Sequence, residues 1–94
     1  MDKEGLILYF NNRGFIYKGK KELKGFAPVY FFLGSRGSIG FSQEKEGWLI
    51  SFSRFNGAWY QEEIKELTKI YGKCDEEWNE NYAHYLLWHT QNLA

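Results

Sequence analysis

PVYFFLGSRGSIGFSQEKEGWLISFS, residues 28–53, alternates short apolar runs with turns that contain glycine. Residues 29–33, 39–41 and 48–52 are rich in β-branched and aromatic side chains, and polar residues at 34–37 and 43–47 separate them. Runs of this length and composition are typical of strands joined by hairpins. Residues 29–33 are apolar on both faces, which predicts a central strand, whereas 48–53 alternates in the manner of a half-buried one.

The stretch before this segment also has the composition of strands. Residues 6–10 (LILYF) precede Asn11-Asn12-Arg13-Gly14, and Asn and Gly tolerate the positive φ of a hairpin turn. We therefore expect a strand at 6–10, a turn at 11–14, a strand at 15–17 and a solvated, lysine-rich loop at 18–25. These elements make about five strands, most simply an antiparallel meander.

The spacing of apolar residues changes from two to 3.6 after Asn56-Gly57. Tyr60, Ile64, Leu67 and Tyr71 fall on one helical face, and Gly72 then predicts the end of a helix. A second helix is predicted from Asp75 as N-cap. Its apolar face would contain Trp78, Tyr82, Tyr85, Leu86, His89 and Leu93.

The predicted fold class is therefore α+β. We expect a single domain over residues 1–94, with a β-rich part at 1–57 and two C-terminal helices at 58–94 packed on one face of the sheet.

Charge is unevenly distributed, although the formal net charge is zero. Residues 1–57 contain nine Lys and Arg against five Asp and Glu, and residues 58–94 contain three against seven. The single cysteine, Cys74, excludes an internal disulfide and suits a reducing compartment. Because no secretory leader and no run of about 20 apolar residues occur, we expect a cytoplasmic protein without membrane contact.

Motifs typical of catalytic, phosphate-binding or metal-binding sites are either absent or lack the neighbouring elements that such sites require. Gly34-x-x-Gly37-x-x-Gly40 is followed by a predicted strand rather than the helix that a phosphate site needs, so it predicts a hairpin. On the predicted second helix, His84 with Glu76 and Glu80 forms a solvated stripe, and His89 is expected to be buried with a hydrogen-bond partner. Cys74 is expected to be a capping or buried thiol. We expect no enzyme activity, no metal and no cofactor.

The aromatic content of four Trp, seven Tyr and eight Phe exceeds what a small core requires and favours binding. We expect a protein partner contacted by Arg36, Trp59, Leu87 and Trp88, because exposed Trp and Arg are typical binding anchors. Such a chain would act as an inhibitor or adaptor that occludes a larger macromolecule, as phage or mobile-element factors do against host enzymes or defence systems. A homodimer is compatible with the same residues.

The basic, aromatic half offers a second interpretation, a module that binds single-stranded nucleic acid by stacking and charge. Its contacts would be Tyr17, Lys18, Lys20, Lys21, Lys24 and Tyr30. A small-ligand pocket between the sheet and the helices is a further alternative.

Overall fold

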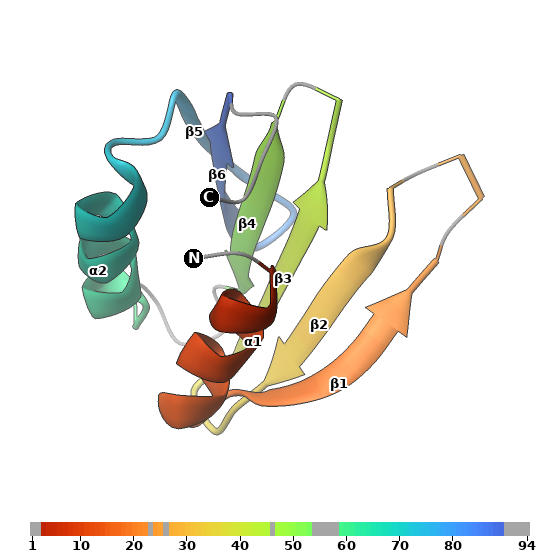
Figure 1. The fold of residues 1–94 in the computed structure, drawn as a ribbon, viewed down its shortest axis with the longest axis vertical. Helices are drawn as coiled ribbons and strands as arrows, with labels where there is room; N and C mark the ends of the chain where they lie inside the picture. Colours follow the sequence, from red (N-terminus) through yellow and green to blue (C-terminus); the bar gives the residue numbers. More distant parts are fainter. Residues whose placement is uncertain (1–2, 23, 26, 46, 54–58, 90–94) are drawn as a thin grey trace.

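The computed structural model describes residues 3–22, 24–25, 27–45, 47–53 and 59–89, which form one small α+β domain (Figure 1). Its elements are α1 (Lys3–Asn12), β1 (Ile16–Lys21), β2 (Val29–Leu33), β3 (Ser38–Gln43), β4 (Trp48–Ser53), α2 (Gln61–Tyr71), β5 (Glu76–Glu80) and β6 (Ala83–Trp88). The six strands form one sheet in the order β1-β2-β3-β4-β6-β5, and every neighbouring pair is antiparallel. The α+β class is confirmed.

The strands predicted from the central segment are confirmed as β2, β3 and β4. The turn at 34–37 is closed by a hydrogen bond from the Gly34 N–H to the Gly37 carbonyl, and the Glu44 N–H likewise donates to the Gly47 carbonyl. Residues 34–40 therefore form a hairpin and the first part of a strand, not a phosphate loop. The predicted loop at 18–25 is shorter than expected, because β1 continues to Lys21.

The first predicted helix is also confirmed. Leu67 and Tyr60 are buried, and Ile64 and Tyr71 pack against the core, so the predicted apolar face is the buried one. Gly72, with φ of 85°, follows the last helical residue and donates its N–H to the Thr68 carbonyl. Positive φ is accessible to glycine without steric cost, which explains why the helix ends here.

The prediction of a strand at residues 6–10 is wrong, because this segment belongs to α1. Leu6 and Phe10, one helical turn apart, are both fully buried, while Leu8 between them is 62% exposed. A run of five apolar residues fits either a strand or a buried helical turn, and periodicity alone does not separate the two. The segment is helical because a helix places Leu6 and Phe10, four residues apart, on the same buried face.

The prediction of two C-terminal helices is also wrong. The structure has one helix at the N-terminus and one in the interior of the chain, and residues 76–88 form the β5–β6 hairpin. Aromatic residues of the predicted helical face instead pair across the two strands: the Trp78 and Tyr85 rings stack with centroids 5.3 Å apart. Such pairs, together with the ladder to β4, outweigh the local helical spacing. Asn56-Gly57 and Leu93 lie outside the described residues.

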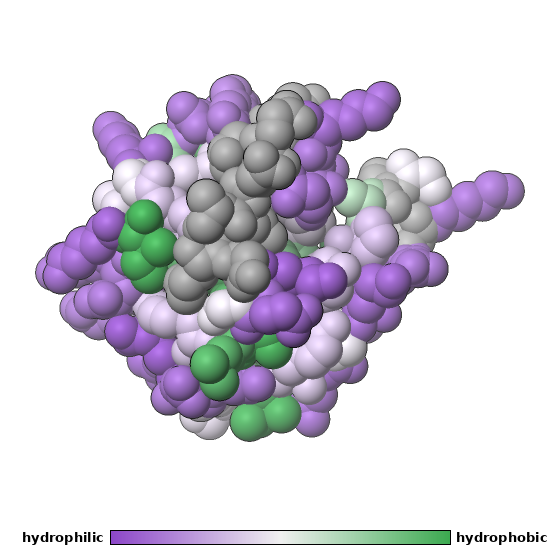
Figure 2. All heavy atoms as spheres, in the orientation of Figure 1, coloured by the Kyte–Doolittle hydropathy of each residue, from purple (hydrophilic) through white to green (hydrophobic). Residues whose placement is uncertain are grey.

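Both helices pack on the same face of the sheet. Phe10 of α1 contacts Phe32 edge to face at 5.2 Å, and Tyr71 of α2 contacts Trp48 at 4.4 Å. Strand β4 shows the division between the faces, since Trp48, Ile50 and Phe52 are buried while the residues between them are not. On the side seen in Figure 1, the surface is mainly hydrophilic, with small separate hydrophobic patches (Figure 2).

Candidate functional site

The sheet has a second face that no described helix covers, which we call the open sheet face. Strand register places on it the alternate residues of each strand, among them Lys21, Phe31, Leu33, Gly40, Ser42, Leu49, Ser51, Glu76, Trp78, Glu80, Tyr85 and Leu87. Much of this face is apolar, and Ile16 and Leu33, which pair across β1 and β2, are 54% and 50% exposed. Apolar side chains on a solvated sheet face are typical of an interaction surface.

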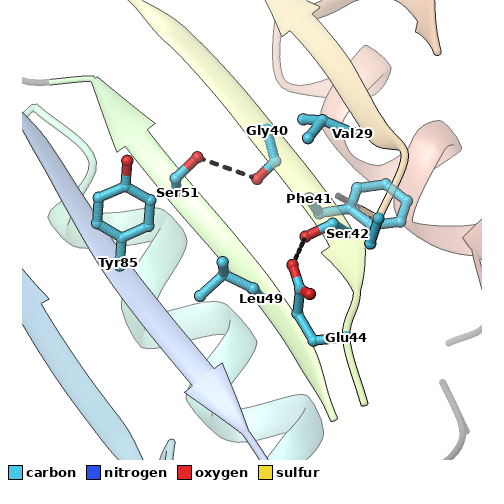
Figure 3. A pocket seen from close by; sticks show the side chains of 9 residues that line it. Val29, Gly40, Phe41, Ser42, Glu44, Leu49, Ser51 and Tyr85 are labelled. Atoms are coloured by element: carbon cyan, nitrogen blue, oxygen red, sulfur yellow. Dashed lines mark hydrogen bonds between the residues drawn. The ribbon is translucent and has the colours of Figure 1, made fainter. Parts of the chain in front are cut away.

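A hollow of about 260 Å³ occupies the middle of the open sheet face, and Figure 3 shows it with α2 behind the strands. It exists because the floor residues Gly40 and Ser51 are small, and Leu49 and Tyr85 stand beside them. A Cβ on Gly40 would lie 3.1 Å from the Ser51 Oγ and 3.2 Å from the Val29 Cγ1, so a larger residue would require these side chains to move by a few tenths of an ångström. The hollow is lined by Ala27, Val29, Gly40, Phe41, Ser42, Glu44, Leu49, Ser51 and Tyr85.

The two serines of the hollow each donate a hydrogen bond within it. The Ser42 hydroxyl donates to the Glu44 carboxylate at 2.8 Å, and the Ser51 hydroxyl donates to the Gly40 carbonyl at 3.5 Å. Among the described hydrogen bonds, Glu44 is the one ionisable side chain that either serine contacts. The hollow therefore offers shape and apolar contact beside a hydrogen-bonded serine–glutamate pair.

The predicted contact residues Arg36 and Trp59 lie together, but they serve the fold. The Arg36 guanidinium is 3.0 Å from the Glu63 carboxylate and lies over the rings of Phe15 and Trp59. The Glu63 side chain is 1% exposed, and its second oxygen has no hydrogen-bond partner in the described part of the chain. Trp59 is half-buried and donates its indole N–H to the Ser53 carbonyl at 2.9 Å. Arg36 thus compensates a buried charge while its side chain remains 51% exposed.

The predicted contact residues Leu87 and Trp88 are buried, which corrects the expectation that they lie at the surface of a helix. Leu87 is 7% exposed and Trp88 is 4% exposed. Because consecutive strand residues point to opposite faces, Leu87 pairs with Leu49 on the open sheet face and Trp88 turns into the core. Trp88 stacks on Trp48 at 4.8 Å and donates its indole N–H to the Gly72 carbonyl.

The two histidines each meet a glutamate of β5. His84 Nε2 is 2.5 Å from the Glu77 carboxylate, and its Nδ1 is 3.1 Å from the Tyr60 hydroxyl. His89, expected to be buried, is exposed, and its Nε2 is 2.7 Å from the Glu76 carboxylate. A glutamate–histidine–tyrosine chain could move a proton, but Tyr60 is 1% exposed and cannot meet a substrate. The chain instead ties the hairpin to α2.

A feature that sequence reasoning missed is the tip of the β5–β6 hairpin. Asn81 and Tyr82 both have positive φ, 49° and 61°, as in a two-residue type I′ turn. Tyr82 is 83% exposed. Four carboxylates, from Asp75, Glu76, Glu77 and Glu80, lie in residues 75–88, which contain no Lys or Arg. We call residues 75–88 the acidic hairpin. Its turn could have been predicted from Asn81, a residue that tolerates positive φ and lies between two aromatic runs.

The residues predicted to contact nucleic acid are brought together at the opposite edge of the sheet. Lys18, Lys20, Lys21 and Lys24 belong to β1 and the turn that follows it, which we call the basic arm (Figure 1). Tyr17 and Tyr30 stack at 6.4 Å on the helix-bearing face beside it. Glu22, at 3.0 Å, raises the pKa of Lys20, which keeps this lysine charged. Arg36 follows the other end of β2, so it does not share the basic arm.

Cys74 is half-buried and does not precede a helix, which corrects its expected environment. Burial, with a further contribution from Glu77, raises the pKa of its thiol. The described residues contain no group of three or more His, Cys, Asp and Glu side chains arranged to hold a metal ion.

Comparison with protein-family models, with curated proteins and with solved structures gives no match to this chain. Neither described helix has the length and apolar character required to cross a membrane.

Proposed function

We propose that this chain is a small non-catalytic protein-binding module, an inhibitor or adaptor, that docks the tip of its acidic hairpin on a larger protein. The observation that carries the proposal is Tyr82, a large aromatic side chain that is 83% exposed in a left-handed backbone conformation. Exposed tyrosines are frequent anchors of protein interfaces, because they combine a large apolar ring with a hydroxyl.

The backbone at Tyr82 strengthens this argument. A type I′ turn strongly favours Asn-Gly, and a bulky residue with positive φ costs on the order of 1 kcal/mol. The fold would accept glycine here, since the Tyr82 ring makes little contact with the rest of the protein. A bulky residue at a position where the turn prefers glycine supports a role outside the fold. The carboxylates beside it favour a partner whose binding surface is basic.

The experiment is capture of a partner from a cell lysate by the immobilised protein, identified by mass spectrometry, with Tyr82→Gly as the test variant. We expect the variant to fold and to lose the stoichiometric partner, while Tyr82→Phe, which keeps the ring and the backbone strain, retains it. Glu80→Lys should weaken capture through the lost charge. Equal capture by wild type and Tyr82→Gly would overturn the role of the hairpin tip, and turnover of a small molecule without a partner would overturn the function.

A second candidate function, binding of single-stranded nucleic acid, is favoured by the four lysines of the basic arm, although Lys20 lies on the face of Tyr17 and Tyr30 and Lys21 lies on the opposite face. Lys3 adds a fifth cation, 5.0 Å above the Tyr30 ring. Fluorescence anisotropy with a labelled oligonucleotide at low salt tests this function. Binding should weaken steeply with salt, by a logarithmic slope of about −0.7 per phosphate contact. Lys18→Glu should abolish it, and Lys69→Glu on α2 is the matched control; no binding by wild type at low salt excludes this function.

A further inference from the structure

The open sheet face has a charge asymmetry that runs from one edge strand to the other. Lys21 lies on it at the β1 edge, where it pairs with Val29 and stands 4.6 Å above the Phe31 ring. Glu76 and Glu80 lie on it at the β5 edge, paired with Leu87 and Ala83. The face is therefore basic at one side, acidic at the other and mainly apolar or small between.

Such a face is complementary to itself in one orientation. A two-fold axis parallel to the strands, between β3 and β4, places β1 of one copy over β5 of the other at both sides. A two-fold axis perpendicular to the strands would instead place β1 over β1 and set like charges against each other. Charge complementarity selects the first arrangement. Two sheets stacked in this way, with nearly aligned strands about 10 Å apart, form an ordinary β-sandwich.

The sizes of the side chains agree with the same axis. One row of cross-strand partners runs over all six strands: Gly19, Phe31, Gly40, Ser51, Tyr85 and Trp78. The two-fold axis sets the largest of these, Trp78, opposite Gly19 of the second copy, and sets Tyr85 opposite Phe31. Gly40 and Ser51 meet beside the axis, where no bulky side chain holds the sheets apart.

The neighbouring row brings the charges into opposition. It begins at Lys21, passes Ser42 and Leu49, and ends at Glu76 beside Leu87. The axis sets Lys21 of each copy opposite Glu76 of the other and sets Leu49 over Ser42. Leucine over serine is again a large side chain against a small one, in the part of the face that contains the hollow.

We propose that a second copy of this chain covers the open sheet face, related by a two-fold axis that runs parallel to the strands between β3 and β4. This self-association goes beyond the proposed function, because Tyr82 extends past the last cross-strand pair of the hairpin and stays available to a partner. The second copy covers the exposed and half-buried residues of the two rows, since Ser42 and Leu87 are already buried, and the symmetric pair Lys21–Glu76 specifies the orientation.

The test is sedimentation equilibrium of the full chain at about 50 mM salt and at protein concentrations from about 1 to 300 µM. We expect wild type to sediment at twice the 11.2 kDa mass of the chain and Ser51→Arg, which places two cations at the axis, to be monomeric with an unchanged circular dichroism spectrum. Lys21→Glu and Glu76→Lys should each raise the dimer Kd about tenfold. The double variant should restore it, because the exchanged charges still attract.

Lys20→Glu is the matched control, because it makes the same change of charge on the same strand but on the helix-bearing face, where Lys20 pairs with Tyr30. It should leave the Kd unchanged. A monomeric wild type at the highest concentration, or a double variant weaker than both single variants, would overturn the proposal. If wild type is monomeric and Ser51→Arg loses the captured partner, the open sheet face binds that partner and not a second copy. If wild type is monomeric and only Tyr82→Gly loses the captured partner, the proposed function stands without the dimer.

Discussion

Replacing Arg36 by methionine tests the buried ion pair most directly. The substitution removes the guanidinium that lies over the Phe15 and Trp59 rings and leaves the Glu63 carboxylate, 1% exposed, without its cation. At 3.0 Å and an effective dielectric constant of 20, the Coulomb energy would be about 5.5 kcal/mol. The Arg36 side chain is 51% exposed, so water screens this attraction. Hydrogen bonds to charged groups contribute about 1.5–3 kcal/mol net, and we expect Arg36→Met to lower the free energy of unfolding by about 2 kcal/mol.

Urea denaturation followed by tryptophan fluorescence measures this change, with the midpoint expected to fall by roughly 1–2 M at an unchanged slope. Glu63→Gln in the Arg36→Met background should recover part of the loss, because a neutral amide is less costly to bury than an unpaired carboxylate. Arg13→Met, which removes an exposed guanidinium stacked on Tyr9, is the matched control and should cost less than about 1 kcal/mol. A loss below about 0.5 kcal/mol for Arg36→Met, or a double variant less stable than the single one, would refute the reasoning.

Three further predictions follow from local geometry. Tyr82→Gly should raise the melting temperature by roughly 3–6 °C in a thermal scan, because it relieves the positive φ; an unchanged or lower value would show that the turn carries no strain. Burial raises the pKa of Tyr9 above its ordinary 10.0, so the free energy of unfolding should be unchanged below pH 10 and fall as the pH rises beyond it. In denaturation series at pH 8–11, the free energy of unfolding of Tyr9→Phe should fall less than that of wild type. Cys74, whose pKa is raised from 9.0 by burial, should react with iodoacetamide several-fold more slowly than free cysteine at neutral pH, as mass spectrometry would measure; an equal rate would contradict this.

Elements with strong local signals were predictable from sequence. Strands β2, β3 and β4 are short apolar runs between glycine turns, and α2 combines a regular apolar face with a glycine stop. Both signals act within a few residues, so no distant contact had to be known. The candidate site was less predictable. Arg36 and Trp59 were predicted only as separate contact residues, and nothing in the sequence indicates that Glu63, rather than another glutamate of α2, is buried beside them.

The amino-acid sequence by itself determined the α+β class, the central hairpins, the amphipathic helix at residues 61–71 and the separation of basic from acidic halves. The tertiary structure alone decided the state of residues 6–10 and 76–88, whose patterns fit a helix and a strand about equally well. It also decided how charge is distributed across the open sheet face, because pairing β6 with β4 places the acidic strand β5 at the far edge from β1. Sequence separation says nothing about lateral order in a sheet, since that order depends on which strand edges are left to pair once the core has packed.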